Sequence, residues 1–154
     1  MKPSSALPLA DRYSTSLDDP TRVKIEGLLQ WFRSQGNVLV ALSGGVDSSV
    51  VAALAKIALN DKAVAVTVKS LTLSASDLDA ALKIVGFTKI RHIIVTHDEL
   101  ANSRVAENPP DRCYYCRSEL VSVLRKIASS EGIETLVDGT NTDDLKGWLS
   151  VTLS

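Results

Sequence analysis

The sequence predicts an α/β fold built on a doubly wound parallel sheet, for three reasons. Short apolar runs of strand length alternate along the chain with longer segments whose apolar residues recur at helical spacing. The first of these runs is continuous, as in a strand that is buried on both faces. It ends at a Ser-Gly-Gly turn that leads directly into a helical segment. Ligands of such sheets bind beyond the carboxyl ends of the strands.

The composition is that of one folded domain. A chain of 154 residues buries enough surface for one core. Hydrophobic residues make up 45% of it and charged residues 23%, which argues against disorder. The net charge of -1, with both signs mixed, gives no reason to expect nucleic acid as a partner. No apolar run approaches the roughly 20 residues that span a bilayer, and residues 1–16 lack the apolar stretch of a signal peptide. We therefore expect a cytoplasmic protein without a membrane partner.

The first 19 residues are rich in Ser, Pro and Asp and show no sustained periodicity. We expect them to form a flexible arm, and residues 20–154 to form the folded domain. Asp19 and Pro20 have the pattern of an N-cap followed by a proline in the first helical position. A first helix is therefore predicted over 21–34, and Gly36 and Asn37 close it.

Strands and helices then alternate. The predicted strands cover 38–42, 63–68, 91–96 and 135–137, and the predicted helices cover about 48–59, 76–85 and 113–130. Ser76 and Asp79 have the spacing of a capping box, and Asp111 is placed to cap the helix that carries both cysteines. This run of βα units predicts a parallel sheet with helical crossovers.

The chain reads SGGVDSS from residue 43, between the first of these strands and the helix after it. Gly44 and Gly45 allow the backbone to approach an anion closely, and the helix start presents N–H groups and about half a positive charge. The hydroxyls of Ser43, Ser48 and Ser49 are further donors. The loop has no lysine in the Walker position, so transfer of a γ-phosphate is not favoured. These features predict a phosphate-binding loop of another kind.

Asp47 is electrostatically unfavourable beside an anion unless a divalent cation bridges the two, which makes Mg²⁺ the expected third component. A plainer interpretation also exists. Ser-Gly-Gly is a good turn, and an aspartate near a helix start is a good cap. The residues alone leave these two interpretations open.

The string from Ser43 to Ser48 resembles the SGGxDS signature of the PP-loop ATP pyrophosphatases at all six positions. The resemblance implies a Rossmann-like, adenine nucleotide α-hydrolase-like fold and cleavage of ATP between its α and β phosphates. The acceptor becomes adenylated and pyrophosphate is released. It further implies that the loop binds the pyrophosphate portion, with Asp47 as its catalytic metal ligand. The adenine would lie near the end of the second strand, at Ser70.

The segment NPPDRCYYCR, residues 108–117, holds both cysteines of the chain. Cys113 and Cys116 share one face of a first helical turn, where the helix start and the flanking arginines favour thiolates. Four interpretations compete: a redox disulfide, half of a zinc site, two ligands of an iron–sulfur cluster, and structural cysteines. Zinc needs four ligands, and His92 and His97 lack the paired spacing to complete a site. The fold signals are not those of thioredoxin.

Taken together, SGGVDSS, NPPDRCYYC and VDGTNTDD (residues 137–144) resemble the ATP-dependent sacrificial sulfur transferases that mature the nickel-pincer cofactor of lactate racemase. In that family a carboxylate of a pyridinium dicarboxylate mononucleotide is adenylated. Sulfur then comes from a sacrificed cysteine or through a [4Fe–4S] cluster held by three cysteines. The resemblance implies that Cys113 and Cys116 are catalytic residues or cluster ligands. It implies nucleotide binding by Thr140 and Asn141 and metal binding by Asp144, although a turn followed by a helix cap would explain the same residues.

The family continues into an Arg-Pro-Gly stretch with a further cysteine, whereas this sequence reads LKGWLSVTLS after the Asp pair. We therefore expect the C-terminal sulfur-transfer segment to be missing. The expected activity is ATP-dependent adenylation of a small-molecule carboxylate or carbonyl. The alternatives are a nucleotide-binding or assembly module without turnover, and an amide-forming or tRNA-thiolating ligase. A shortened sheet exposes an edge, which predicts a homo-oligomer.

Overall fold

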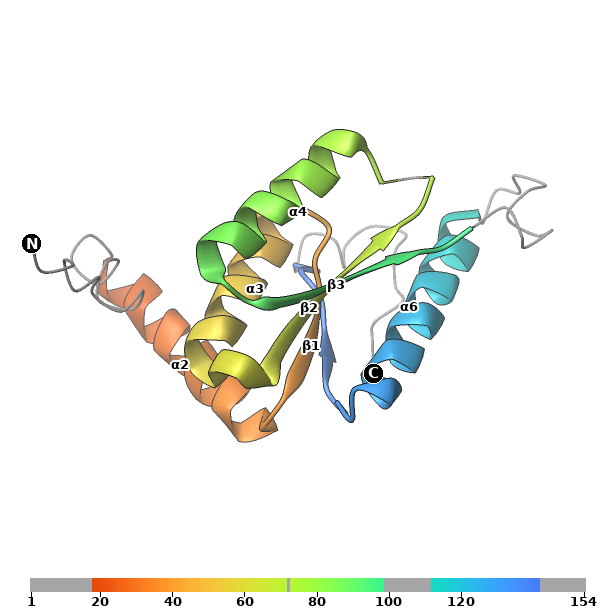
Figure 1. Ribbon diagram of the computed structural model, residues 1–154. Coiled ribbons are helices and arrows are strands. Elements are labelled where there is room, and N and C mark those ends of the chain that lie inside the picture. Colours follow the sequence, from red (N-terminus) through yellow and green to blue (C-terminus); the bar gives the residue numbers. More distant parts are fainter. Residues whose placement is uncertain (1–17, 72, 99–111, 142–154) are drawn as a thin grey trace, which may run out of the picture.

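The computed structural model describes residues 18–71, 73–98 and 112–141, with backbone alone for 112–115 (Figure 1). The elements alternate between helix and strand, as the apolar pattern predicts. In chain order they are α2 (Asp19–Gln35), β1 (Val38–Ala41), α3 (Val46–Leu59), a 3-10 turn η1 (Asn60–Lys62), β2 (Ala63–Lys69), α4 (Ala75–Thr88), β3 (Arg91–Thr96), α6 (Arg112–Ser130) and β4 (Leu136–Val137).

The four described strands form one parallel sheet in the order β3-β2-β1-β4. Val40 of β1 lies opposite Ala65 of β2 on one side and opposite Val137 of β4 on the other. Because every pair is parallel, the carboxyl ends of all four strands meet at one edge of the sheet. This arrangement confirms the predicted α/β class. β3 and β4 are the edges of the described sheet, and the expected homo-oligomer stays a prediction.

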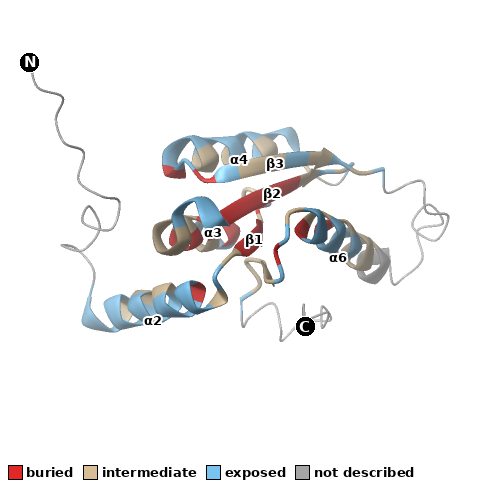
Figure 2. Ribbon diagram, turned by 60° about the horizontal axis from the view of Figure 1, so that its bottom comes forward, coloured by how far each residue is buried: buried red, intermediate tan, exposed pale blue. Residues whose placement is uncertain are grey.

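Helices cover both faces of the sheet, with α2, α3 and α4 on one side and α6 on the other (Figure 2). Alternate side chains of β1 point to opposite faces of the sheet: Val38 and Val40 pack toward α3, and Leu39 packs toward α6. All three are fully buried, and burial of such a side chain contributes roughly 1.5–3 kcal/mol. The sheet is therefore doubly wound, as expected. None of the helices in the described ranges is long and apolar enough to cross a membrane.

Two of the predicted helix caps differ from those in the structure. The N-cap of α2 is Asp18, not Asp19, and its Oδ1 accepts from the amide of Thr21 at 3.1 Å. Hydrogen bonds from the side chain of Thr21, first, and from its amide lower the pKa of the Asp18 carboxyl. The N-cap of α4 is Ser74, whose Oγ accepts from the amide of Asp77 at 3.1 Å, so the predicted capping box of Ser76 and Asp79 is wrong by two residues. The predicted cap at Asp111 lies outside the described residues.

Candidate functional site

The candidate phosphate loop, residues 43–45, connects the central strand to α3. Leu42 extends β1 by one residue, since its amide donates to the carbonyl of Val66 at 2.8 Å. The N-cap of α3 is Gly45, which has no side chain to bond the first turn. The N–H groups of a first helical turn have no intrahelical acceptor. Those of α3 are therefore left for a ligand or for solvent, at the edge of the sheet where the strands end.

The serine hydroxyls of the loop bond one another and the loop backbone. Ser48 Oγ donates to the carbonyl of Gly45 at 3.1 Å and accepts from the amide of Ser43 at 3.3 Å. The hydroxyls of Ser43 and Ser48 lie 3.1 Å apart, and since the Ser48 proton is already used, Ser43 donates in that pair. Ser49 Oγ also donates to Gly45, at 2.6 Å. The donors left to face an anion are therefore backbone N–H groups, which the sequence had predicted, whereas the hydroxyls that it had added as further donors are used within the loop.

The loop is packed between two other segments. Gly44 has a φ of 90°, and a Cβ there would collide with the carbonyl of Asp77 in the first turn of α4. On the other side, a Cβ at Gly139 would lie 2.5 Å from the amide nitrogen of Ser48. The turn after β4 thus rests directly on the backbone at the start of α3. Only glycine fits at either contact.

Asp47 lies at the exposed start of α3, where Asn141 reaches it from the turn after β4. The Nδ2 group of Asn141 donates to Oδ2 of Asp47 at 3.0 Å. The structure therefore joins two residues that the sequence separates by 94 positions. No group of three or more His, Cys, Asp or Glu side chains converges within the described ranges. Asp144, the other expected metal ligand, lies outside them.

A cleft of about 570 Å³ opens beside the loop, between α6 and the carboxyl ends of β1, β2 and β4. It brings together most of the predicted site: Ser43, Gly45, Asp47, Ser48, Ser70, Cys116 and Thr140 line it. Apolar side chains complete its walls, among them Val66 and Val68 from the sheet and Leu120, Val121 and Leu124 from α6. Gly44, Ser49 and Asn141, three other predicted site residues, are not among the residues that line the cleft. Cys113 lies one helical turn before Cys116 in α6, and its side chain is outside the described residues.

Arg117 and Asp138 form an ion pair that the sequence did not predict. Arg117 Nη2 lies 3.2 Å from Oδ2 of Asp138 and donates to the hydroxyl of Thr140 at 2.7 Å. The second carboxylate oxygen of Asp138 accepts from the amide of Thr140 at 3.0 Å. Both charged side chains are about three-quarters buried. An aspartate directly after a predicted strand, before Gly-Thr, is the signal that could have indicated a turn fixed by its own side chain.

A hydrogen-bonded pair lies behind the loop, within the sheet. Thr67 is buried, and its Oγ1 lies 2.8 Å from the carbonyl of Leu42 and 2.8 Å from Nε2 of His92. Burial lowers the pKa of His92. His97, at the end of β3, lies 3.4 Å from a carboxylate oxygen of Glu119 in α6. Neither histidine lines the cleft.

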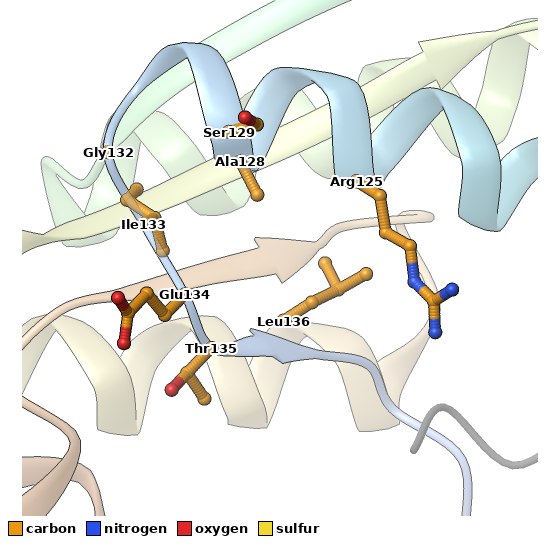
Figure 3. A pocket seen from close by; sticks show the side chains of 8 residues that line it. All are labelled: Arg125, Ala128, Ser129, Gly132, Ile133, Glu134, Thr135 and Leu136. Carbon is orange, nitrogen blue, oxygen red and sulfur yellow. The ribbon is translucent and has the colours of Figure 1, made fainter.

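A second hollow of about 680 Å³ lies at the opposite edge of the sheet (Figure 3). Figure 3 shows its lining side chains on the last turns of α6 and on the segment that enters β4. None of the predicted site residues lines it. Parallel sheets bind ligands beyond the carboxyl ends of their strands, and this hollow lies at the amino end of β4. We therefore place the candidate site in the smaller cleft.

Comparison with known proteins places the chain in a family. It matches the model of the asparagine synthase family over residues 30–119. It is 39% identical to the uncharacterized protein slr1717 of Synechocystis sp. over 125 residues, and this alignment covers 81% of this chain and 47% of that protein. It is 31% identical to the pyridinium-3,5-bisthiocarboxylic acid mononucleotide synthase of Lactiplantibacillus plantarum over 108 residues, and this alignment covers 70% of this chain and 39% of that protein. The chain thus spans less than half the length of these two relatives.

The fold has a solved counterpart. The NH3-dependent NAD synthetase of Campylobacter jejuni superposes with a TM-score of 0.69 at 17% identity, covering 84% of this chain and 60% of that one. At that identity the likeness concerns the fold alone. The family match covers more than half of the chain and includes the loop at 43–48 and the cysteine pair. The chain belongs to the asparagine synthase family, within the PP-loop ATP pyrophosphatase superfamily.

Proposed function

We propose that this chain binds ATP at residues 43–48 and adenylates an acceptor carboxylate or carbonyl, releasing pyrophosphate, as the first step of a sulfur transfer. One observation carries the proposal: Cys116 and the phosphate loop line the same cleft. An adenylated acceptor held by the loop would therefore face a thiol. Membership of the PP-loop superfamily supports the ATP-dependent part.

The loop suits a pyrophosphate group better than a transferred γ-phosphate. Its N–H groups and the dipole of α3 stabilise negative charge. Arg117 is the one cationic side chain among the described residues that line the cleft, and Asp138 already pairs with it. None of the lysines in the described part of the chain lines the cleft, where one could follow a γ-phosphate. Asp47 fits Mg²⁺, because that ion binds through one or two carboxylates together with substrate phosphates. Asp144 is our proposed second carboxylate.

The apolar part of the cleft fits an adenine ring. Val66 and Val68 form one wall and Leu120 and Leu124 the other, with Ser70 at the strand end. Ligand sites are commonly apolar clefts with a few polar groups that fix orientation. Here the polar groups gather at the loop, which would hold the phosphates. We propose that Ser70 lies beside the base.

The acceptor class follows from the cysteine and from one relative. Cys116 supports delivery of sulfur, and the L. plantarum relative is named for a pyridinium bisthiocarboxylic acid mononucleotide. We therefore propose a pyridinium carboxylic acid mononucleotide as acceptor. The chain has two cysteines, fewer than the three or four thiolates that hold a [4Fe–4S] cluster. A cluster would need thiolates from another segment or a second copy, so the proposal includes no step through one.

Product analysis tests the proposal. The protein is incubated with Mg²⁺ and ATP labelled at the α-phosphate, with and without the acceptor. We expect labelled AMP and adenylate with release of pyrophosphate, only when acceptor is present. ADP and phosphate would overturn the proposal. ATP that binds but returns intact across carboxylate and carbonyl acceptors would favour a binding module without turnover.

Two matched variants locate the activity. Asp47→Asn removes the proposed metal ligand at the start of α3, and we expect it to lose most of the pyrophosphate release. Asp61→Asn makes the same change just beyond the other end of α3, where Asp61 is exposed and pairs with Lys56 at 3.1 Å. We expect this variant to retain activity. Equal losses in the two variants would show that Asp47 has no special role.

A further inference from the structure

We propose that Arg117, Asp138 and Thr140, here called the α6 clamp, couple occupancy of the phosphate loop to the reactivity of the Cys116 thiol. The inference rests on the proposed function, because it takes a nucleotide as the ligand of the loop. It adds a positioning role for Arg117 and Asp138. Three contacts, taken in order from the loop to the cysteine, carry it.

The first contact joins the loop to the turn after β4. At Gly139 a Cβ would lie 2.5 Å from the amide nitrogen of Ser48, 2.8 Å from its Cα and 2.9 Å from the carbonyl carbon of Asp47. These are backbone atoms, which cannot move aside as the end of a side chain can. The start of α3 and the turn therefore shift together.

The second contact involves the charged group of the loop. Oδ2 of Asp47 accepts from Nδ2 of Asn141 at 3.0 Å. A cation or a phosphate that binds beside this carboxylate changes the environment of the amide as well. Binding of a ligand at the loop can therefore displace the turn after β4 through two contacts, the backbone contact at Gly139 and the hydrogen bond of Asn141.

The third contact joins the turn to α6. Arg117 Nη2 binds Oδ2 of Asp138 at 3.2 Å and the hydroxyl of Thr140 at 2.7 Å, on either side of Gly139. The exposed fractions of the Arg117 and Asp138 side chains are 21% and 27%. Removing one partner of a largely buried pair leaves a poorly solvated charge, so such a pair constrains its surroundings more than an exposed one does.

Arg117 of the clamp lies in a part of α6 where none of the described side chains is fully buried. Leu124 is the first buried residue of that helix among those with described side chains, whereas residues 116–123 are half-buried or exposed. Two of the polar contacts that hold the segment around Cys116 come from Arg117, which bonds the turn after β4. Cys116 directly precedes Arg117. A displacement of the turn would therefore change how the Cys116 thiol is presented to the cleft.

Alkylation of Cys116 tests the coupling. In a Cys113→Ser background Cys116 is the only thiol, and its reaction rate with iodoacetamide is measured with and without saturating Mg²⁺–ATP. We expect ATP to change this rate by about fivefold or more, the range typical of coupled sites. In Arg117→Met and Asp138→Asn versions of that background we expect the ratio of the two rates to approach one. Arg125→Met is the matched control, since it removes a cation from the same helix at the opposite hollow, and it should keep the full ratio.

The ratio separates coupling from simple shielding and from misfolding. If ATP merely covers the thiol, the ratio persists in Arg117→Met and Asp138→Asn, and the clamp is overturned. A ratio of one in the parent overturns it as well. Should Arg117→Met unfold, Arg117→Lys and Asp138→Asn carry the test, with folding checked by circular dichroism. Calorimetric titration with Mg²⁺–ATP distinguishes the two proposals: absence of binding overturns the proposed function, while binding without an effect on Cys116 overturns the clamp alone.

Discussion

Oγ1 of Thr67 and Nε2 of His92 lie 2.8 Å apart, directly behind the residue that precedes the phosphate loop. The hydroxyl proton of Thr67 is used on the carbonyl of Leu42, also at 2.8 Å. Thr67 therefore accepts from His92, which requires the proton of the neutral imidazole to be on Nε2. Thr67 and His92 thus hold the Leu42 carbonyl in place at the point where β1 ends and the loop begins.

The first prediction concerns the pH dependence of stability. Burial lowers the pKa of His92 below the ordinary histidine value of about 6.5, so the unfolded state binds its proton more readily than the folded state does. The contribution of His92 to stability should be complete above about pH 6.5 and should be lost as the pH falls toward the lowered pKa of the folded state. His92→Gln, which retains an N–H donor, should remove this loss.

Urea unfolding between pH 5 and 8 measures the effect. His97 is present in both proteins, so the difference between wild type and His92→Gln isolates His92. We expect the wild type to lose more stability than the variant on acidification. Curves that stay parallel across this range would contradict the assignment.

The second prediction concerns Thr67 itself. Thr67→Val keeps the shape of the side chain and removes its oxygen, which leaves the Leu42 carbonyl and the His92 N–H without their partner. We expect the free energy of unfolding to fall by about 1–3 kcal/mol, the cost of unsatisfied buried polar groups. Thr96→Val is the control, because Thr96 is exposed at the end of β3, and its effect should stay within about 0.5 kcal/mol. Comparable losses in the two variants would refute a special role for Thr67.

The strands and the loop could be predicted because their signals are local. The first strand was expected over 38–42 and forms over Val38–Ala41, and the third forms as expected over Arg91–Thr96. The loop was found from adjacent residues alone. Contacts across the sheet could not be found in this way: Arg117 is 21 residues from Asp138, and Gly139 is far from Ser48 in sequence. The hydrophobic periodicity that predicts helices and strands carries no information on which strand end contacts which loop.

The boundaries of α4 show where local rules become ambiguous. Ser74 and Ser76 each precede an aspartate by three residues, so both satisfy the same capping pattern. The structure selects Ser74, and it places the carbonyl of Asp77 against Gly44. The helix also continues through Gly86 to Thr88, beyond the predicted end at 85. Packing of the helix on the sheet outweighs the weak helix propensity of one glycine.

The third prediction compares two glycines that undergo the same substitution. Gly139→Ala should reduce stability by about 1–3 kcal/mol, because its Cβ meets the backbone of Ser48 and Asp47. It should also weaken ATP binding, since the start of α3 must shift. Gly86→Ala places its Cβ in open space within α4 and should raise stability by about 0.5–1 kcal/mol. Thermal unfolding and calorimetric titration measure both effects, and a change of the same sign in the two variants would show that the contact at Gly139 has been misjudged.

The fourth prediction concerns the pair of Asp47 and Asn141. Asn141→Asp replaces a hydrogen-bond donor, 3.0 Å from the Asp47 carboxylate, with a second carboxylate. Two like charges this close repel each other unless a cation bridges them. Without Mg²⁺, ATP binding should therefore weaken by about tenfold or more, and added Mg²⁺ should restore much of it. Asn37→Asp makes the same change at the amino end of β1, where Asn37 bonds the Gly132 carbonyl, and should leave the Mg²⁺ dependence unaltered. If both variants bind ATP with the same Mg²⁺ dependence, Asp47 does not lie where the cation binds.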